Sequence, residues 1–409
     1  MSINVVTEAK RCLNCKNPMC RQGCPIATNI PTMIQMFLHN QKDEAGEMLF
    51  RNNPLSVVCS LVCNHEKQCE GHCILGRKGE PVQISSIENY ISDAYLDHPT
   101  LQREPSKGMR AAIVGSGPAG ITISIILAQK GYDVTLFETR EKIGGVLRYG
   151  IPAFRLPKEI LDRYKEQLVR LGIKIRPNTA VGTSLTIDDL FRDGYQAIFI
   201  GTGVWRPKQL GIKGESLGHV HFAIDYLTNP DVYDLGKSIA VIGAGNSAMD
   251  AARTALRKGV RQVSMLCRRS HAAANVRELE YAIADGVEMM YGCRPVEITD
   301  EGVVYQKAEL DDQDQVLSLG EPQLLRCDSV IVAVSQGALN RIVSTTKGLN
   351  TTDKGLLTAD DKGSTTRPGV FAGGDVVLGA KTVVEAVHFS KEVAYAMDRY
   401  LQSLREKAE

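Results

Sequence analysis

The sequence predicts an α/β protein, in which an α-helical N-terminal domain precedes two Rossmann-like dinucleotide-binding domains. Three observations predict this class. Eight of the eleven cysteines lie between Cys12 and Cys73. Two apolar strands run into glycine-rich turns and then helices, at residues 111–120 and 238–256. Strand-rich sequence returns after residue 340 and ends in a helical pattern over Val383–Leu401.

The composition is that of an ordinary globular protein, with 43% hydrophobic and 23% charged residues and a net charge of +1. Such a charge offers no electrostatic case for nucleic acid or an anionic membrane as partner. The N-terminus lacks the basic-then-apolar pattern of a signal peptide, and no apolar run reaches the roughly 18 residues of a spanning helix. We therefore expect a cytoplasmic protein.

The clustered cysteines form two groups. The first is Cys12-x2-Cys15-x4-Cys20-x3-Cys24-Pro25, and the second is Cys59-x3-Cys63-x5-Cys69-x3-Cys73. Iron–sulfur clusters need soft thiolate ligands, and a cysteine followed by proline tends to bind a neighbouring cluster. Eight thiols therefore predict two four-iron clusters with four cysteines each. Zinc sites are the alternative, although they usually show short C-x2-C pairs or Cys/His mixtures.

The first glycine-rich turn predicts a dinucleotide site. Gly115, Gly117 and Gly120 follow an apolar strand, and a helix opens at Pro118 and Ala119. Glycines permit a tight turn and the close approach of a pyrophosphate to the helix N-terminus. The next strand, over residues 133–137, ends in Glu138, where a carboxylate can bind a ribose hydroxyl.

The second glycine-rich turn contains Gly243, Gly245 and, in the third position, Ala248. Its second strand, over residues 262–267, ends in Arg268 and Arg269 instead of an acid. Guanidinium groups at this point suit a 2′-phosphate, which favours NADP over NAD. The alternative is that the two arginines are solvated loop charges.

Two further strand–turn segments fit a bound flavin. Residues 197–203 form an apolar strand that reaches a glycine turn, and residues 369–375 form another that ends in an aspartate and precedes a helix start. The aspartate can meet a ribityl hydroxyl while the helix N-terminus faces the flavin ring. Plain strand–turn–helix units are the alternative. The candidate flavin-binding residues here are Gly203, Gly374, Asp375, Thr382 and Val383.

Taken together, these motifs resemble a known family. It includes the small subunit of NADPH-dependent glutamate synthase, the N-terminal half of dihydropyrimidine dehydrogenase and the large subunit of NADH-dependent ferredoxin:NADP oxidoreductase. The resemblance covers essentially the whole chain and is carried by CLNCKNPMCRQGCP, CEGHCILGRKGEPVQISSIE, GSGPAG, GGVLRYGIPAFRLPK, GAGNSAMD, CRR and FAGGDVVLGAKTVVEAV. It implies a helical iron–sulfur domain (1–102), an FAD domain (103–230 and 340–409) and an inserted NADP domain (231–339).

The resemblance also implies site residues. The first [4Fe-4S] cluster would take Cys12, Cys15, Cys20 and Cys73. The second would take Cys24, Cys63, Cys69 and Glu88, where some relatives have Gln, and Cys59 would then be spare. Cys59 as a ligand in place of Glu88 remains the alternative. The family pattern implies FAD contacts from Gly145, Leu147 and Arg155, and NADP contacts from Asn246, Ser247, Arg268, Arg269 and Arg277.

One departure from the family concerns the strand end at residues 333–337. Relatives often have a glycine there, whereas this chain has Ser335. This strand end lies where the flavin and nicotinamide domains are expected to meet, so the local nicotinamide contacts are expected to differ.

We expect an electron-input subunit of a hetero-oligomer. NADPH would reduce FAD, and electrons would pass singly through two clusters to a partner protein, or in reverse. Because cofactors carry such chemistry, we nominate no acid–base side chain. Alternatives within the family are a flavin-bifurcating ferredoxin:NADP oxidoreductase and a dihydropyrimidine dehydrogenase subunit that uses NADH.

Two alternatives lie outside the family. A thioredoxin-reductase-like enzyme needs a redox C-x-x-C beside the flavin, and residues 110–345 contain only Cys267, Cys293 and Cys327. A non-enzymatic cluster scaffold or redox sensor would not need two intact dinucleotide sites.

Overall fold

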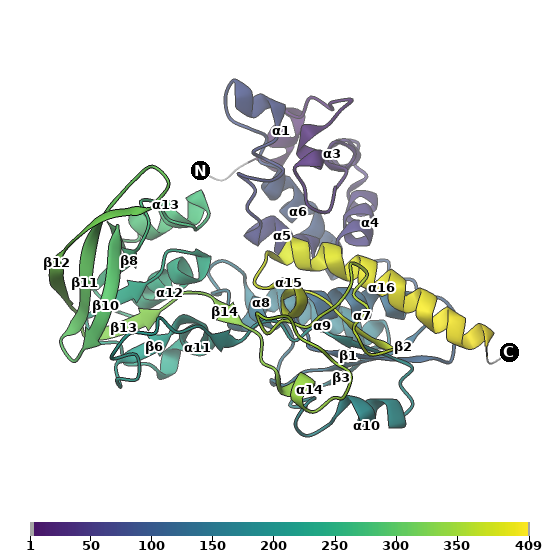
Figure 1. The fold of residues 1–409 in the computed structure, drawn as a ribbon. Helices are drawn as coiled ribbons and strands as arrows, with labels where there is room; N and C mark the ends of the chain where they lie inside the picture. Colours follow the sequence, from purple (N-terminus) through teal and green to yellow (C-terminus); the bar gives the residue numbers. More distant parts are fainter. Residues whose placement is uncertain (1–3, 408–409) are drawn as a thin grey trace. The chain divides into compact units, whose positions relative to one another are not determined.

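The computed structural model describes residues 4–407, and the chain divides into two compact units (Figure 1). The first unit contains the chain up to Leu147, Ala153–Val204 and the chain from Ala338 onward. The second contains Arg148–Pro152 and Trp205–Gly337. A strand at Val220–Phe222 pairs within the sheet of this second unit.

The N-terminal region is helical, and its cysteines lie mainly in the connecting loops. Its core is apolar and is formed by helix positions that share one face, such as Ile30, Met33 and Ile34. The elements are α1 (Val5–Lys10), α2 (Met19–Gln22), α3 (Ile30–Leu38), α4 (Lys42–Asn52), α5 (Ser56–Val62), the 3₁₀-helix η1 (Ile74–Arg77) and α6 (Ile84–Asp97).

The rest of the first unit, called here the flavin fold, is built on a parallel sheet of order β15-β4-β1-β2-β3. Its strands are continuous apolar runs because helices cover both faces of such a sheet. Helix α16 has 24 residues, and no helix within residues 4–407 is long and apolar enough to cross a bilayer. The strands are β1 (Arg110–Val114), β2 (Asp133–Phe137), β3 (Lys174–Arg176), β4 (Ala197–Ile200) and β15 (Val370–Ala372).

The helices of the flavin fold include the two that begin at predicted cofactor turns. Helix α7 starts directly after the first glycine turn, and it packs against α16 (Figure 1). The helices are α7 (Pro118–Gln129), α9 (Lys158–Arg170), α10 (Ile187–Arg192), α14 (Arg341–Ser344), α15 (Asp375–Leu378) and α16 (Val383–Glu406), and α8 (Val146–Tyr149) spans the boundary between the units.

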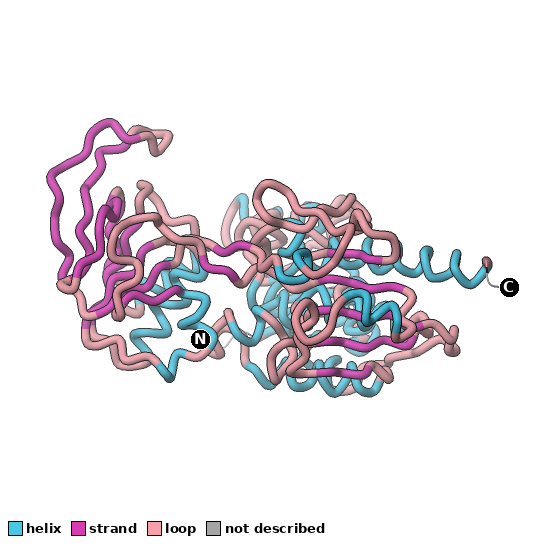
Figure 2. Tube along the Cα trace, turned by 60° about the horizontal axis from the view of Figure 1, so that its bottom comes forward, coloured by secondary structure: helices cyan, strands magenta, loops and turns pink. Residues whose placement is uncertain are grey.

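The second unit repeats the parallel architecture, with the strand order β6-β13-β7-β8-β9. A three-stranded antiparallel sheet is added to it, and its long hairpin stands out in magenta in Figure 2. The two Rossmann-like folds predicted from the glycine turns are confirmed. The elements are β6 (Val220–Phe222), β7 (Ser238–Ile242), β8 (Gln262–Cys267), β9 (Glu288–Tyr291), β10 (Cys293–Thr299), β11 (Gly302–Leu310), β12 (Val316–Arg326), β13 (Ser329–Val332), α11 (Ala223–Thr228), α12 (Asn246–Arg257) and α13 (Val276–Ala284), with the short pair β5 (Arg206–Pro207) and β14 (Gln336–Gly337) and the 3₁₀-helix η2 (Pro230–Val232).

Polar contacts from α9 fasten the N-terminal region to the flavin fold. The Tyr164 hydroxyl donates to the Pro54 carbonyl at 2.7 Å, and the Tyr164 side chain is fully buried. Beside it, the Arg163 guanidinium lies 2.5 Å from Asp93 Oδ1 and 2.9 Å from Asp97 Oδ1. A buried acceptor that loses its donor costs more free energy than the bond contributes net. This interface therefore couples the stability of the two regions.

We predict that Tyr164→Phe lowers the free energy of unfolding by about 1–3 kcal/mol, because the Pro54 carbonyl would be left buried and unsatisfied. Chemical denaturation followed by circular dichroism measures this loss. The matched control is Tyr195→Phe, since that ring packs against Phe137 and its hydroxyl has no hydrogen bond within the described residues. Equal effects of both substitutions would show that the Tyr164–Pro54 bond has no special role.

Candidate functional site

Four cysteines of the N-terminal region line one cavity of about 70 Å³. Cys12 and Cys15 lie in the loop after α1, Cys20 lies in α2, and Cys73 precedes η1. Much of the remaining wall is apolar and includes Ile34 from α3. These four are the cysteines that the family resemblance implies for the first cluster, so the structure brings this ligand set together although Cys73 is distant in sequence.

The burial of these thiols indicates what the cavity can hold. The pKa of Cys20 is raised to about 11, mainly by burial and to a smaller extent by the neighbouring Cys12, Cys73 and Cys15. The pKa of Cys12 is also raised by burial, with contributions from Cys15 and Cys73. Ligand thiols must be deprotonated, and a bound metal supplies the positive charge that makes this favourable. The cavity therefore fits an iron–sulfur cluster, whose irons would bind these four sulfurs.

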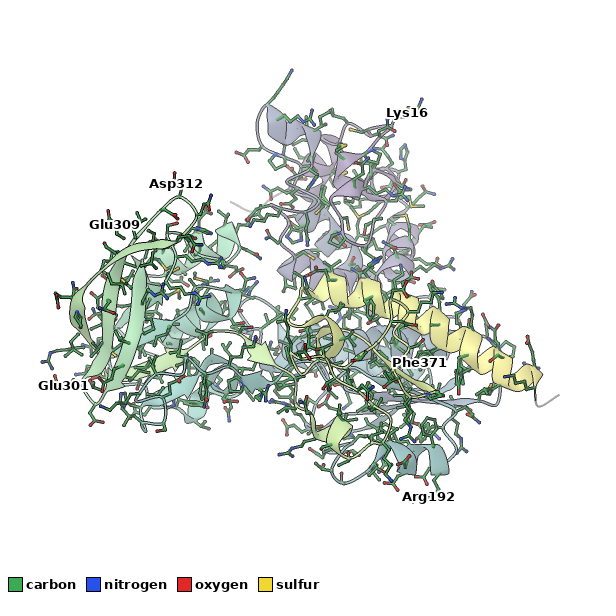
Figure 3. All side chains as sticks on the ribbon, viewed as in Figure 1. Lys16, Arg192, Glu301, Glu309, Asp312 and Phe371 are labelled. Atoms are coloured by element: carbon green, nitrogen blue, oxygen red, sulfur yellow. The ribbon has the colours of Figure 1, made fainter. Side chains whose placement is uncertain are left out.

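The mouth of this cavity is apolar and positively charged. Leu13, Met19 and Ile74 line the cavity and are 61%, 37% and 42% exposed. The two segments that carry its cysteines, residues 12–24 and 71–79, contain no Asp or Glu, and Glu80 follows directly after the second. We call the exposed basic residues of these segments the basic rim, and none of them forms an ion pair within residues 4–407. The basic rim consists of Lys16, Arg21, Arg77 and Lys78, of which Lys16 is labelled in Figure 3.

A second group of ligand candidates is more deeply buried. The pKa of Cys69 is raised by burial and then by Glu88, Glu70 and Cys24. Burial also raises the pKa of Glu88 to about 8, with a smaller contribution from Glu70. Glu88 and Cys24 therefore both lie near Cys69. In the absence of a cluster, this raised pKa favours the neutral Glu88 carboxyl group. The positive charge of a bound cluster's iron would favour the carboxylate, so Glu88 fits the role of a ligand.

Cys59 lies beside the same group. Its thiol is 3% exposed, and its hydrogen bond with Cys63 is the largest cause of the raised pKa of Cys63, followed by burial. Glu88 and Cys69 raise the Cys63 pKa further. The structure therefore places both Cys59 and Glu88 next to Cys63. Within residues 4–407, no three His, Cys, Asp or Glu side chains are arranged to hold a single metal ion.

The glycine turn of the flavin fold has the geometry of a pyrophosphate site. Gly115 has a φ of +101°, and a Cβ there would lie 2.5 Å from the Gly201 carbonyl oxygen. A Cβ on Gly120 would lie 1.8 Å from the Gly115 carbonyl oxygen, whereas one on Gly117 would meet nothing within 4 Å. The turn thus packs tightly on two sides and stays open at Gly117, where α7 begins without a side-chain cap. This opening fits the pyrophosphate of FAD.

Glu138 lies at the end of β2 beside this turn and is 7% exposed. Its Oε2 accepts hydrogen bonds from the backbone N–H of Ser116, at 3.1 Å, and from the Ser116 hydroxyl. Its Oε1 accepts from the Arg140 N–H at 2.8 Å. The carboxylate is thereby held in the position expected for a ribose contact. Sequence reasoning missed Ser116, because the residue between two fingerprint glycines is variable in the pattern.

Three other predicted flavin residues converge on the same helix start. A Cβ on Gly145 would lie 2.8 Å from the Gly117 Cα, and one on Gly374 would lie 3.0 Å from the Ala119 Cβ. Asp375 follows, and burial raises its pKa to about 6. Its Oδ1 accepts from the Lys381 N–H at 3.2 Å.

The remaining flavin candidates lie in four other segments of the flavin fold. Thr382 caps α16 in a capping box with Glu385, and Val383 is the first residue of that helix. Leu147 is fully buried, and its carbonyl accepts from the Lys158 ammonium at 2.8 Å. Gly203 has a φ of +69° in the turn after β4, and Arg155 is partly buried. Thr382 therefore uses its side chain for the helix, which leaves backbone groups at this helix start for a ligand.

The second unit contains an equivalent turn. A Cβ on Gly243 would lie 2.4 Å from the Ala333 carbonyl oxygen, and one on Gly245 would meet nothing within 4 Å. Helix α12 begins here without a side-chain cap. The Asn246 side chain is held by the Asn275 N–H, which donates to its Oδ1 at 2.9 Å. Ser247 follows within the first turn of α12. This opening fits the pyrophosphate of a nicotinamide dinucleotide.

Arg268 and Arg269 are exposed directly after β8, and Arg277 is exposed in α13. The loop after the arginine pair is held by Asp314 from the β11–β12 hairpin, which accepts the Ser270 N–H at 2.8 Å and lies 3.4 Å from His271 Nδ1. The Ser270 bonds lower the Asp314 pKa, and so do the charges of His271 and Arg269. No local sequence signal indicates Asp314, because a whole hairpin separates it from this loop.

Ser335, where the resemblance implies a glycine in many relatives, has a φ of +87°. A non-glycine residue in this region is strained, by roughly 1–2 kcal/mol in the left-handed conformation. Its carbonyl accepts from the Lys208 N–H at 3.1 Å, and this bond links the strand pair β5 and β14. The backbone therefore keeps a shape that suits glycine.

Two family models match the chain. Residues 109–390 match the pyridine nucleotide-disulphide oxidoreductase model, and residues 2–99 match a model described as dihydropyrimidine dehydrogenase domain II, 4Fe-4S cluster. Together they cover both glycine turns and all eight clustered cysteines. The chain is thus an oxidoreductase whose family cofactors are FAD and NAD(P), with an N-terminal 4Fe-4S domain.

Curated relatives extend over nearly the whole chain. The glutamate synthase [NADPH] small chain of Escherichia coli is 30% identical, with 97% of this chain and 91% of that protein covered. The NAD-dependent dihydropyrimidine dehydrogenase subunit PreT of Salmonella typhimurium is 33% identical, with 97% and 94% covered.

Among solved structures, FprA of Mycobacterium tuberculosis in complex with NADPH superposes with a TM-score of 0.60 at 20% identity. The match covers 75% of this chain and 87% of FprA, and it supports the fold alone. Fold, glycine turns, thiol cavity and relatives agree, and the chain belongs to the pyridine nucleotide-disulphide oxidoreductase family, in the branch of the glutamate synthase small chain and PreT.

Proposed function

We propose that this chain is an electron-input subunit that takes electrons from NADPH and delivers them, through FAD and two [4Fe-4S] clusters, to a partner protein. The observation that carries the proposal is the combination of two open, uncapped helix starts with a thiol-lined cavity that opens to the surface. The relatives named as a small chain and as a subunit support a role within a larger complex.

The cofactors would supply the redox chemistry, since a flavin accepts the two electrons of a hydride and can release them one at a time to two one-electron clusters. The residues of this chain bind and orient. The starts of α7 and α12 would hold the pyrophosphates, and Glu138 would hold a ribose. The proton of the reduced flavin would leave to solvent as the electrons depart.

The structure supports an order for the two clusters. The flavin fold contacts the N-terminal region at Asn52, where Lys391 of α16 donates to it, and at Pro54, where Tyr164 of α9 donates. Tyr164 also lies close enough to Cys59 for that thiol to raise its pKa, after the larger effect of burial. The second ligand group thus faces the flavin fold, and the first lines a cavity open to the surface. We infer that electrons enter at the second cluster and leave from the first.

The surface around the exit favours an acidic partner. Exposed apolar residues surrounded by charge are typical of a protein interface, and the residues of the basic rim form no ion pair within residues 4–407. Opposite charges across an interface mainly accelerate association. We therefore infer that the electron acceptor presents carboxylates around its own redox centre.

A second candidate is NADH-dependent dihydropyrimidine reduction with a partner subunit. The 33% identity to PreT, whose name gives NAD as its cofactor, favours this reading. Arg268 and Arg269 favour NADP, because no acid stands at the end of β8 to bind a ribose hydroxyl. A disulfide reductase finds no support, since Cys267, Cys293 and Cys327 are buried free thiols far apart in sequence.

The proposed function predicts a definite result for anaerobic titration of the purified protein with NADPH. The flavin absorbance should bleach, and an electron paramagnetic resonance (EPR) signal of reduced clusters should follow at higher NADPH. Apoprotein reconstituted with FAD but without iron should bleach only. If the holoprotein keeps its oxidised flavin spectrum with both NADPH and NADH, the proposal is wrong.

Coenzyme choice tests the arginine pair. We predict that Arg268→Ala combined with Arg269→Ala lowers the NADPH/NADH ratio of kcat/KM by about 10- to 100-fold, because hydrogen bonds to charged groups contribute about 1.5–3 kcal/mol. Arg261→Ala is the matched control, since Arg261 is exposed at the other end of the same strand. An unchanged ratio in the double variant would refute the assignment of these arginines.

Charge reversal in the basic rim tests whether electrons leave the protein from the first cluster. Lys16→Glu combined with Arg21→Glu should slow electron transfer to an acidic plant-type ferredoxin, and the dependence of this rate on ionic strength should weaken or reverse. Flavin bleaching by NADPH should stay unchanged, because neither residue lies in the flavin fold. Lys354→Glu combined with Lys362→Glu, in exposed loops of the flavin fold, is the charge-matched control. Equal rates in all three proteins would place the exit elsewhere.

A further inference from the structure

A continuous chain of hydrogen bonds runs from α16 of the flavin fold to Cys24. The Lys391 ammonium donates to the Asn52 carbonyl oxygen at 2.7 Å and to Asn52 Oδ1 at 3.1 Å. Asn52 Nδ2 donates to Thr28 Oγ1 at 3.2 Å and to the Ile26 carbonyl at 3.2 Å. Cys24 Sγ lies 3.5 Å from Thr28 Oγ1. Two side chains, Asn52 and Thr28, thus connect the Lys391 cation to one candidate ligand.

The direction of this chain depends on the state of Cys24. As a thiol, Cys24 donates its proton to the Thr28 hydroxyl. As a ligand it is a thiolate without a proton, so it can only accept. The Thr28 oxygen already accepts from Asn52, and its own proton is then free to point at the Cys24 sulfur. Every donor in the chain then points from Lys391 toward the cluster.

The positive charge at the start of the chain is not neutralised by an ion pair. Within residues 4–407, Lys391 forms no salt bridge, and its nearest acidic influence is the exposed Glu392 of the same helix. Lys391 is partly buried, and Thr28 is 3% exposed. In such surroundings the chain is screened little by water, and hydrogen bonds in series polarise one another.

We propose that Lys391, Asn52 and Thr28 raise the reduction potential of the second cluster by stabilising the extra negative charge that reduction places on it. Hydrogen bonds to ligating sulfurs and nearby charge are established determinants of cluster potential. This inference rests on the proposed function for one point, the role of Cys24 as a ligand. These residues touch no cofactor except through Cys24 and are positioning residues.

This chain of hydrogen bonds also gives helix α16 a second role. The helix begins at the candidate flavin site and contacts the N-terminal region two turns later, at Lys391. A raised potential at the cluster nearer the flavin favours the departure of electrons from the flavin. Helix α16 would therefore connect the flavin site with the second cluster in two ways. It contacts the N-terminal region through Lys391, and it supplies the positive charge of that side chain.

Redox titration with dithionite and mediators, followed by EPR, tests this proposal without NADPH. Lys391→Met should lower the potential of one cluster, and about 59 mV corresponds to a tenfold change in its one-electron reduction equilibrium. Asn52→Leu and Thr28→Val should lower the potential of the same cluster. Lys391→Arg, which keeps the charge, should retain most of the original potential.

Arg399→Met is the matched control, because it removes a positive charge from an exposed position on the same helix. Iron and sulfide content shows that each variant holds its clusters. If Lys391→Met and Thr28→Val contain full iron and both leave every potential unchanged, the proposal is overturned. Absence of iron from the native protein would instead refute the proposed clusters, so the two failures are distinguishable.

Discussion

A buried thiolate is unfavourable unless positive charge lies beside it, and this constraint organises the N-terminal region. Burial is the main cause of the raised pKa of Cys12, Cys20 and Cys69. The thiols also raise one another's pKa, so the isolated chain has no means of ionising them together. An iron–sulfur cluster resolves this conflict, because ligation supplies the missing positive charge. The short helices around the thiols provide apolar walls and leave the ligation to loops.

Buried polar groups also hold the N-terminal region against the flavin fold. Cys69 and Glu88 of the second ligand group are buried, and side chains of the flavin fold donate hydrogen bonds to the backbone nearby. Tyr164 and Lys391 donate to backbone carbonyls of the N-terminal region, at Pro54 and Asn52. The two dinucleotide turns depend on the absence of a side chain. Gly117 and Gly245 leave open space, and any larger residue there would occupy the space proposed for a pyrophosphate.

Local signals in the sequence predicted much of this architecture. The strands over residues 133–137 and 262–267 have the predicted bounds, because glycine turns and apolar runs are both local patterns. No local pattern predicted β6, since this strand is short and polar at His221 and joins its sheet only by pairing with β13. Spacing alone suggested two symmetric clusters, whereas the structure gathers Cys73 with Cys12, Cys15 and Cys20.

Interactions between distant segments could not be predicted. Asp314 reaches Ser270 across a hairpin, and Lys391 reaches Asn52 across most of the chain. Neither pair has a spacing or a motif, because each depends on how separate elements pack. Ser335 is visible in the sequence, but only the structure shows that its φ of +87° is a conformation that suits glycine.

The central claim is that electrons from the nicotinamide site leave through the first cluster. The most direct measurement uses Cys12→Ala, which removes one ligand from the surface cavity, and compares three signals after mixing with NADPH under anaerobic conditions. We predict normal flavin bleaching and a normal EPR signal from the second cluster, with electron delivery to a protein acceptor reduced to the background rate. Delivery at the native rate by a variant shown to lack the first cluster would contradict the account.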